Sequence, residues 1–296
     1  MDTFSIAQLS RYSGIKAHTI RIWEQRYNAL TPHRSEGNIR YYDSSHLRRL
    51  LNIVSLIDDE HKVSQLCELP DRKLFELVDE RIRQTINANS TTEYYISQLI
   101  AAGMTYDEVH FEKIFDASVV KYGMADAYIN VIYPLLVRVG LMWSNDNMPP
   151  ANEHFITNLV RQKLFAALDA IPRFDGESSK WLLFLQEGEF HELGILFANY
   201  LVRGSGKQVV YLGCDVPLHS LIAAFNTAAP QYALMFIVQR DEPEIIENYL
   251  RQISSAFNGK TIYIAGHEYL AAQMQLNGKI KWLKSVADLK DELSFT

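Results

Sequence analysis

The spacing of apolar residues changes twice along the chain and divides it into three parts. In the first part, apolar positions recur at helical intervals and predict helices over about residues 4–13, 17–28, 44–57 and 63–68. Residues 35–38 (Ser-Glu-Gly-Asn) separate two short extended pieces, a pattern typical of a β-hairpin wing. Leu69-Pro70-Asp71 ends this part, so we expect a first domain over residues 1–71.

The second part, residues 72–174, lacks strand signals. Its apolar stripes predict helices over about residues 72–87, 91–102, 106–121, 125–142 and 150–170. The last helix starts at Pro149-Pro150, because proline is favoured in the first helical turn. We therefore expect a four-helix bundle preceded by a linker helix.

In the third part, residues 175–296, short continuous apolar runs alternate with helical segments. Such runs are typical of parallel strands that are covered on both faces. Five strands in about 120 residues fit a flavodoxin-like doubly wound (Rossmann-like) fold, whose ligands bind beyond the carboxyl ends of the strands. The expected strands are Trp181–Leu185, Gln208–Leu212, Tyr232–Val238, Thr261–Ala265 and Ile280–Leu283.

Composition excludes some classes of protein. No apolar run approaches the ~20 residues of a membrane span, and no basic stretch followed by an apolar one opens the chain. The two cysteines, Cys67 and Cys214, fall in different expected domains, so a disulfide between them is not expected. We expect a cytoplasmic protein with no membrane partner.

Charge is unevenly distributed. Residues 1–50 carry eight Lys/Arg and four Asp/Glu, a charge of +4. Because the net charge of the whole chain is −6, the remaining residues carry −10. A basic module on an acidic body is suited to nucleic-acid binding, because attraction to phosphate is local. Charge alone does not distinguish a nucleic-acid-binding module from a solvated surface whose charge is unevenly distributed.

The basic module contains a long ordered set of residues. It comprises Ser5–Ser10, Gly14-Ile15, His18–Tyr27, Leu30–Arg34 and Gly37–Tyr42. This set resembles the MerR family of winged helix-turn-helix regulators, and its Arg-x-Trp-Glu form resembles the light- and cobalamin-responsive branch of that family. The resemblance implies a symmetric homo-oligomer that binds double-stranded operator DNA, usually a palindrome.

The helical pattern also indicates which side chains face DNA. A helix with Ile20 and Tyr27 inward turns its arginines outward, and Trp23 is expected in the core. Wing arginines and a wing tyrosine can reach phosphates, whereas His18 and His33 are as readily solvent-exposed as DNA-bound. The expected DNA-binding residues are Thr19, Arg21, Arg26, Arg34, Arg40, Tyr41 and Tyr42.

A histidine follows the first strand of the third part, in the pattern Glu-x-His-x-x-Gly. Glu189, His191 and Gly194 form this pattern, which by itself equally suits a capping histidine. At this position it resembles cobalamin-binding domains. The resemblance implies that His191 is the lower ligand of cobalt and that Glu189 orients its ring. Gly194 would let the following helix approach the corrin.

A second pattern lies in the helical part: Trp143, then nine residues, then Glu153-His154. A helix-end Trp is more often core, and Glu-His after two prolines often simply starts a helix. The joint spacing resembles helical cap domains over cobalamin. That resemblance implies that Trp143 packs on an adenosyl group, that Glu153 accepts its hydroxyl hydrogens and that His154 lies nearby. Val137 and Met142 would wall the pocket.

The three parts together resemble CarH/LitR-type photoreceptor repressors along essentially the whole chain. The resemblance implies adenosylcobalamin as cofactor, a dimer or tetramer that holds DNA in the dark, and release of DNA when light breaks the cobalt–carbon bond. Such a protein is a switch rather than an enzyme. A methyl-carrying cobalamin enzyme is disfavoured by the DNA-binding module and by the lack of a second substrate domain.

The chain also departs from the cobalamin-binding pattern. These domains usually carry Ser-x-Leu/Thr on the third strand, beside the slot for the nucleotide tail, where this chain has Leu234–Val238 with Phe236. The expected Gly-Gly is Ala265-Gly266, which we still count with the cofactor residues, and Ser144 replaces a histidine found in some photoreceptors. An alternative therefore stays open: a MerR-type regulator whose degenerate cobalamin domain only forms oligomers or binds proteins.

Overall fold

The computed structural model of the protein describes residues 3–13, 15–35, 37–57, 61–85, 92–143, 149–173, 176, 178–237, 243–266 and 279–295. The chain forms two compact units, Met1–Leu159 and Val160–Thr296. The boundary between the units lies inside helix α10 (Pro150–Asp169). No helix in these residues is both long enough and apolar enough to cross a membrane.

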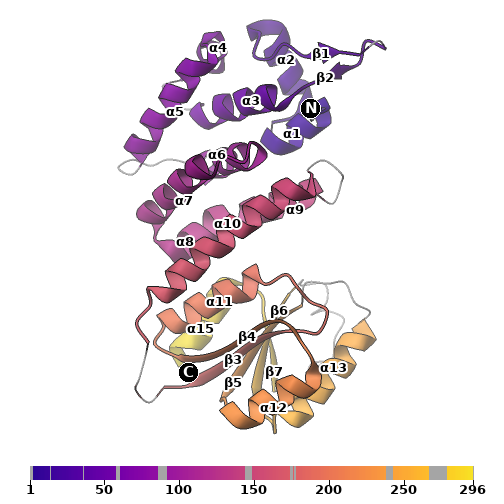
Figure 1. Cartoon of the computed structure of the whole chain (residues 1–296), viewed down its shortest axis with the longest axis vertical. Helices are drawn as coiled ribbons and strands as arrows, with labels where there is room; N and C mark the ends of the chain where they lie inside the picture. Colours follow the sequence, from indigo (N-terminus) through magenta and orange to yellow (C-terminus); the bar gives the residue numbers. More distant parts are fainter. Residues whose placement is uncertain are drawn as a thin grey trace. The chain divides into compact units, whose positions relative to one another are not determined.

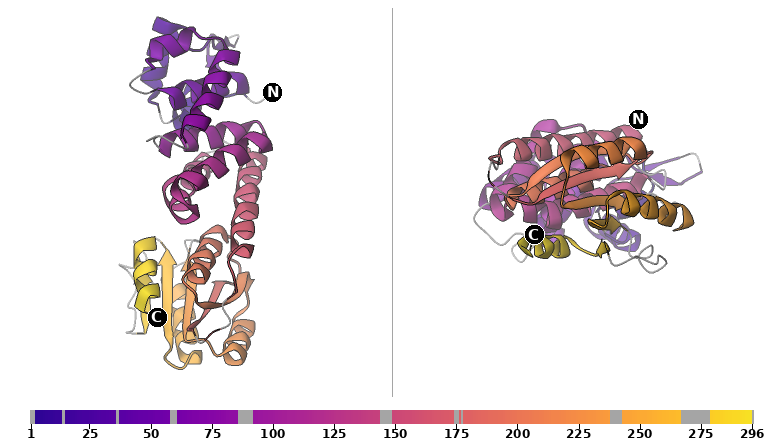
Figure 2. Two further views of the ribbon diagram at one scale, coloured as in Figure 1. Left: turned by 90° about the vertical axis from the view of Figure 1, so that its left-hand side faces the viewer. Right: turned by 90° about the horizontal axis from the view of Figure 1, so that it is seen from below.

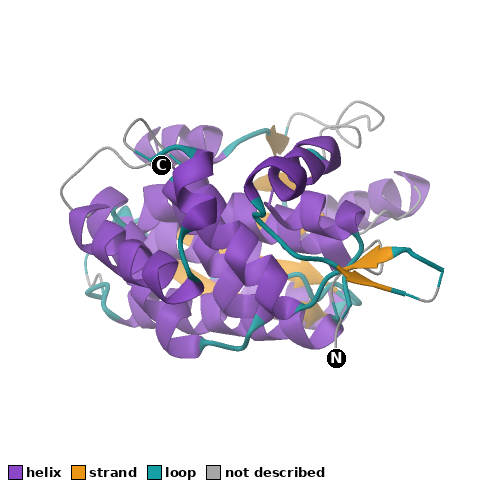
Figure 3. Cartoon of the chain, turned by 90° about the horizontal axis from the view of Figure 1, so that it is seen from above, coloured by secondary structure: helices purple, strands orange, loops and turns teal. Residues whose placement is uncertain are grey.

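The first unit begins with four helices and a two-stranded wing, as the sequence predicts (Figures 1 and 3). The helices are α1 (Ile6–Ser13), α2 (Ala17–Tyr27), α3 (Ser44–Leu56) and α4 (Val63–Glu68). The wing strands are β1 (His33–Arg34) and β2 (Arg40–Tyr41), which pair antiparallel. Apolar side chains close a common core, among them Leu9, Ile20, Trp23, Leu47 and Leu50.

The remaining helices of this unit follow in sequence order. They are α5 (Asp71–Thr85), α6 (Thr92–Met104), α7 (Glu108–Tyr122), α8 (Met124–Ala127), the π-helical turn η1 (Tyr128–Ile132), α9 (Tyr133–Trp143) and the first half of α10. Helix α6 is buried along most of its length and packs against both α3 and α7.

The structure corrects one helix boundary. The sequence predicts a single helix over residues 125–142, whereas α8 and α9 are separated by the wider π turn. Pro134 explains the difference: it has no N–H to donate to the residue four positions earlier, and its ring crowds that carbonyl. A π turn just before the proline relieves that crowding.

Helices α6 and α10 approach closely at a glycine. A Cβ added to Gly103 would lie 2.4 Å from two side-chain carbons of Ile156. Asn152, which is buried, donates from Nδ2 to the Gly103 carbonyl at 3.0 Å. The start of α10 is therefore held against α6 by a contact that only glycine permits.

The second unit contains a parallel sheet of five strands in the order β4-β3-β5-β6-β7. The strands are β3 (Lys180–Gln186), β4 (Gln208–Val216), β5 (Tyr232–Ile237), β6 (Thr261–Gly266) and β7 (Ile280–Leu283). Counted along the chain, this order is 2-1-3-4-5, so the predicted flavodoxin-like fold is confirmed. The predicted strand residue Val238 lies outside the described residues.

Helices cover both faces of this sheet (Figures 1 and 2). Helices α12 (Leu218–Ala228) and α13 (Pro243–Ala256) close one hydrophobic core with the side chains of Leu182, Phe184, Met235 and Ile264. Helices α11 (Leu193–Gly204) and α15 (Val286–Phe295) lie on the other face. The chain reverses direction across the sheet between β3 and β5, and ligands of this fold bind beyond the strand ends there.

Candidate functional site

Helix α2 has one buried side and one exposed basic side. Ile20, Trp23 and Glu24 are buried, as the sequence predicts for Trp23. Arg21 and Arg26 are exposed, and Thr19 is half-buried at the edge of the same face. The helix ends at Asn28, whose left-handed backbone (φ 49°) lets its N–H donate to the Glu24 carbonyl. This face is suited to a DNA groove.

The wing extends away from the helices beside it (Figure 3). Arg34 is exposed and donates to the Asn38 side chain at the wing tip. Arg40 instead reaches back, so that its Nε lies 3.6 Å from Oε2 of the buried Glu24. Arg34 is therefore free to meet a phosphate, whereas Arg40 also ties the wing to α2.

The two wing tyrosines have different environments. Tyr41 is half-buried, with its ring stacked on His33 at a centroid distance of 5.2 Å. Tyr42 is fully buried, and its hydroxyl donates to Glu24. Burial, and then the hydrogen bond to Glu24, raise the pKa of Tyr42. The expectation that Tyr42 contacts DNA is thus corrected to a structural role, because its hydroxyl is already engaged in the core.

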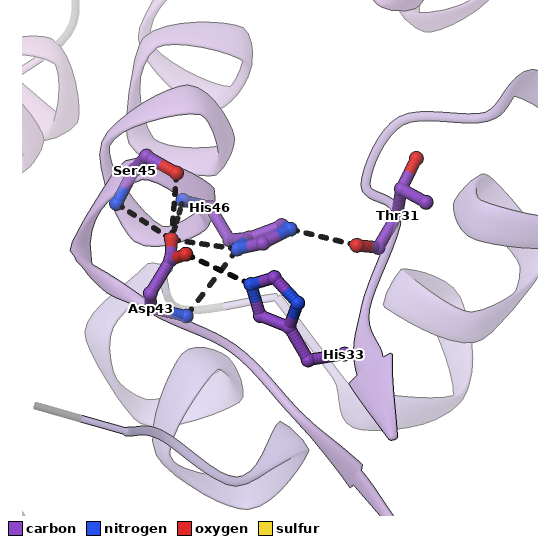
Figure 4. Close-up of polar contacts among 5 residues, drawn as sticks. All are labelled: Thr31, His33, Asp43, Ser45 and His46. Atoms are coloured by element: carbon purple, nitrogen blue, oxygen red, sulfur yellow. Dashed lines mark hydrogen bonds and ion pairs between the residues drawn. The ribbon is translucent and has the colours of Figure 1, made fainter. Parts of the chain in front are cut away.

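Three polar side chains fasten the wing to α3 (Figure 4). Asp43 caps that helix: its Oδ1 accepts from the N–H groups of Ser45 at 3.0 Å and His46 at 3.1 Å. The His46 ring lies between two oxygens, with Nδ1 2.7 Å from Asp43 Oδ1 and Nε2 2.8 Å from the Thr31 carbonyl. His33 Nε2 lies 3.0 Å from the other Asp43 oxygen.

Sequence reasoning missed this cluster because its members have no recognisable spacing. One ligand-type atom from each of His33, Asp43 and His46 lies within 4.8 Å of the others. The hydrogen bonds already explain the arrangement, since each carboxylate oxygen has a partner. Burial raises the pKa of Asp43, but hydrogen bonds from Ser45, His33 and His46 outweigh it and hold that pKa well below its usual range.

Asp43→Ala is expected to destabilise the DNA-binding part by about 1–2 kcal/mol, the usual cost of losing a helix cap. Because the folded pKa of Asp43 is depressed, its contribution is present above the ordinary value of 3.8 and is lost as the pH falls below it. The difference in unfolding free energy between wild type and variant should therefore be constant near neutral pH and shrink below about pH 4.

Asp107→Ala is the matched control, because Asp107 caps α7 through the N–H of His110 at 3.0 Å and lies far along the chain from the wing. Both variants should lower stability, but only Asp43→Ala should weaken DNA binding at neutral pH. Equal DNA affinity in the two variants would show that Asp43 does not position the wing.

A buried polar network joins α3 to the helices that follow. Gln98 Nε2 on α6 donates to Asn52 Oδ1 at 3.2 Å and to Ser55 Oγ at 2.7 Å, both on α3. Gln98 Oε1 lies 3.0 Å from His110 Nε2 on α7. The sequence pattern did not reveal this network, because polar residues on an apolar stripe look like interruptions. It connects α3 to α6 and α7 by specific hydrogen bonds.

In the second unit, the loop after β3 presents a histidine. The structure brings Glu189 and His191 together: Glu189 is fully buried, and its Oε1 lies 2.9 Å from His191 N and 2.6 Å from Nδ1. The His191 side chain is 64% exposed. A proton on Nδ1 that is donated to the carboxylate leaves the Nε2 lone pair directed away from Glu189, as in many metal-binding histidines.

Hydrogen bonds to the end of β4 hold this loop in place. The Gly188 N–H donates to Asp215 Oδ1 at 2.9 Å, and the Asp215 N–H donates to the Glu189 carbonyl at 3.1 Å. Glu192 accepts from Arg161 Nε in the second half of α10. The histidine is thus carried by a braced loop at the carboxyl end of the sheet, where ligands of this fold bind.

The three small residues expected at the cofactor site, Gly194, Ala265 and Gly266, lie next to larger residues. A Cβ added to Gly194, at the start of α11, would lie 3.0 and 3.1 Å from two ring carbons of Phe236 on β5. Ala265 pairs with Phe236 across the sheet, and a Cβ on Gly266 would meet the Ile237 carbonyl at 2.6 Å. Packing against Phe236 explains the glycine at position 194 without a ligand, and the expected approach to a corrin stays a prediction.

The second pattern is described only in part. Trp143 is the last residue of α9, but its side chain, that of Met142 and the whole of Ser144 lie outside what the structure describes. Glu153 is half-buried in the first turn of α10 and lies 2.8 Å from Nδ1 of the exposed His154. Val137 is exposed on α9. A carboxylate in a first helical turn is favoured by the helix dipole, so this pair is also explained locally.

Comparison with known proteins finds two families that match parts of the chain. Residues 4–69 match the family "MerR HTH family regulatory protein", and residues 95–167 match the family "B12 binding domain". The resemblances proposed from the first 70 residues and from the helical part are therefore confirmed at the level of these families.

Two relatives match most of the chain. One is the HTH-type transcriptional repressor CarH of Myxococcus xanthus, 27% identical over 267 residues, which are 89% of each chain. The other is the repressor CarA of the same organism, 28% identical over 263 residues, which are 84% of this chain and 83% of that protein. These relatives are repressors and not enzymes.

A solved structure supports the fold. The monomethylamine corrinoid protein of Methanosarcina barkeri matches with a TM-score of 0.55 and 11% identity, covering 70% of this chain and 100% of that one. The chain thus combines a MerR helix-turn-helix part with a B12 binding domain and is homologous to the two repressors.

Proposed function

We propose that this protein is a transcriptional repressor whose hold on operator DNA is controlled by a bound corrinoid. The observation that carries the proposal is the combination in one chain of two features. One is an exposed basic helix and wing, and the other is a histidine oriented by a carboxylate on the loop after β3. Homology to two repressors over most of the chain supports the same function. A DNA-binding role suits a cytoplasmic protein.

In the proposed complex with DNA, α2 lies in a groove and the wing contacts the backbone. Thr19, Arg21 and Arg26 on the helix would contact bases or phosphates, and Arg34, Arg40 and Tyr41 would contact phosphates or the minor groove. One such module covers little DNA, so we propose that a dimer or tetramer binds a palindromic operator.

For the corrinoid, we propose that His191 Nε2 is the lower ligand of cobalt and that Glu189 fixes the ring and its tautomer. The exposed ring and the buried carboxylate fit this task. A corrinoid supplies a cobalt that accepts an axial nitrogen and, in the adenosyl form, carries a light-sensitive cobalt–carbon bond.

The adenosyl form and the light response remain proposals that rest on the sequence pattern. Trp143 would pack against the adenosyl group, Glu153 would accept hydrogen bonds from its sugar, and His154 would lie beside them. Dark, ligand-bound protein would then hold DNA, and loss of the adenosyl group would shift the population toward a form that releases it.

The test is purification with adenosylcobalamin in the dark, followed by binding to operator DNA before and after green illumination. A coloured stoichiometric complex that binds DNA in the dark and releases it after illumination supports the proposal. The second candidate, a regulator with a degenerate cobalamin domain, is favoured by the Phe236 ring beside Gly194. This second candidate predicts a colourless protein whose affinity for DNA does not change with added corrinoid or with light.

Arg34→Ala is expected to weaken binding to every DNA sequence alike and to reduce the slope of log affinity against log salt by about 1 per protomer, the effect of one lost phosphate contact. The side chain is exposed and donates to Asn38 at the wing tip, so stability should not change. The measurement is fluorescence anisotropy with labelled DNA over a range of salt concentrations.

Arg72→Ala is the matched control. It removes the same charge from an exposed position on α5, where Arg72 pairs with Glu76 at 3.4 Å. Its salt slope should equal that of the wild type. An unchanged slope in Arg34→Ala would place the wing tip away from phosphate.

A further inference from the structure

The ring of Phe236 occupies the space between helix α11 and the carboxyl end of β5. Two of its ring carbons lie 3.0 and 3.1 Å from where a Cβ of Gly194 would be. Because residues alternate along a strand, Phe236 lies on the same sheet face as Leu234, opposite Met235 and the core under α12 and α13. The ring is thus inserted between the sheet and α11.

Two neighbours of Phe236 are small residues. Gly194 faces it from the helix, and Ala265 is its direct partner on β6. A small side chain at position 236 would remove the ring that packs against Gly194, which lies three residues after His191 along the chain. The wild-type chain fills the space beside Gly194 with its own aromatic ring.

This matters for any corrinoid that His191 binds. A complete corrinoid carries a nucleotide tail whose base holds the lower face of cobalt. If His191 takes that face, the base must leave the cobalt, and its tail must find room beside the same loop. A corrinoid without the nucleotide tail makes no such demand.

We propose that Phe236 makes this protein bind corrinoids that lack the nucleotide tail in preference to complete cobalamin. The inference rests on the proposed function, since it requires that His191 binds cobalt. To admit a tail, the half-buried Phe236 ring must leave its place against Gly194. Because part of the ring already faces water, the affinity lost by exposing the rest is about 10-fold.

The test compares two probes by absorbance titration of the full chain: diaquacobinamide, which has no tail, and aquacobalamin, which has one. In the wild type, the tail-free probe should bind about 10-fold or more tightly than the complete one. In Phe236→Ser, the ratio should fall at least about 10-fold, through tighter binding of cobalamin. Equal affinities in the wild type, or an unchanged ratio in the variant, overturn the inference.

Two further variants separate the possible failures. Phe236→Leu keeps an apolar side chain in the sheet and should give an intermediate ratio, provided that its apoprotein unfolds well above the titration temperature. His191→Ala should weaken both probes. If both probes bind the wild type equally and depend on His191, only the tail inference is wrong. If neither probe binds, the proposed function is wrong as well.

Discussion

Replacing His191 by alanine is expected to lower the affinity for a corrinoid by about 100-fold or more. Loss of a residue that only orients a metal ligand commonly costs about 10- to 100-fold, and loss of the ligand should cost more. The fold should survive, because the His191 side chain is largely exposed and is hydrogen-bonded to Glu189 within its own loop. Equilibrium titration followed by absorbance measures the effect.

His219→Ala is the control for this experiment. His219 is also an exposed histidine of the second unit, at the start of α12, with a bond to Ser220. It should leave corrinoid affinity unchanged. If the two alanine variants bind corrinoid equally well, His191 is not the ligand, and the Glu-x-His-x-x-Gly pattern belongs to an ordinary helix start.

Replacing Gly103 by alanine is expected to destabilise the first unit by about 1–3 kcal/mol, the usual cost of overpacking a core. The added methyl would lie 2.4 Å from the buried Ile156, and the Asn152 bond to the Gly103 carbonyl allows little movement of the helices. Chemical denaturation followed by circular dichroism measures the loss.

Gly140→Ala tests the same chemical change where there is space. Gly140 lies exposed on α9, and a Cβ there would meet nothing within 4 Å. Alanine is the better helix former by about 1 kcal/mol, so this variant should be more stable than the wild type. Two substitutions of equal chemistry should therefore move stability in opposite directions. A loss at both positions would contradict the packing argument.

The order and limits of the elements could be predicted because periodicity is a local property. The apolar run Trp181–Leu185, for example, lies within β3, which is one residue longer at each end. Turn residues likewise indicated where the wing lies. An irregular helical turn before Pro134 could have been anticipated from the proline alone. The wider π turn that accommodates it could not, because its form depends on the packing of both flanking helices.

The contacts of the candidate site residues could be predicted where the two partners lie close together in the sequence. Glu189 and His191 are two residues apart, so the carboxylate could be proposed as the partner of the ring. Tyr42 and Glu24 are not, and only the fold reveals that the tyrosine hydroxyl is used inside the core. Adjacent wing tyrosines look alike in a sequence, but alternation along a strand sends one inward.

Packing between residues far apart along the chain shows where the ring of Phe236 lies, which the sequence left open. A phenylalanine at position 236 raised the question of a narrowed slot, but its effect depends on the direction of the ring. The ring lies against Gly194, which is 42 positions away along the chain. The same contact explains why position 194 is a glycine without requiring a ligand.

The most direct test of the account is electron paramagnetic resonance of the protein loaded with reduced cobinamide, in which cobalt carries an unpaired electron. This corrinoid has no base of its own, so an axial nitrogen must come from the protein. We predict splitting by one nitrogen in the wild type, an altered pattern when the protein is labelled with heavy nitrogen, and no splitting in His191→Ala. A bound cobinamide without nitrogen splitting in the wild type would contradict the proposal that His191 holds the cobalt.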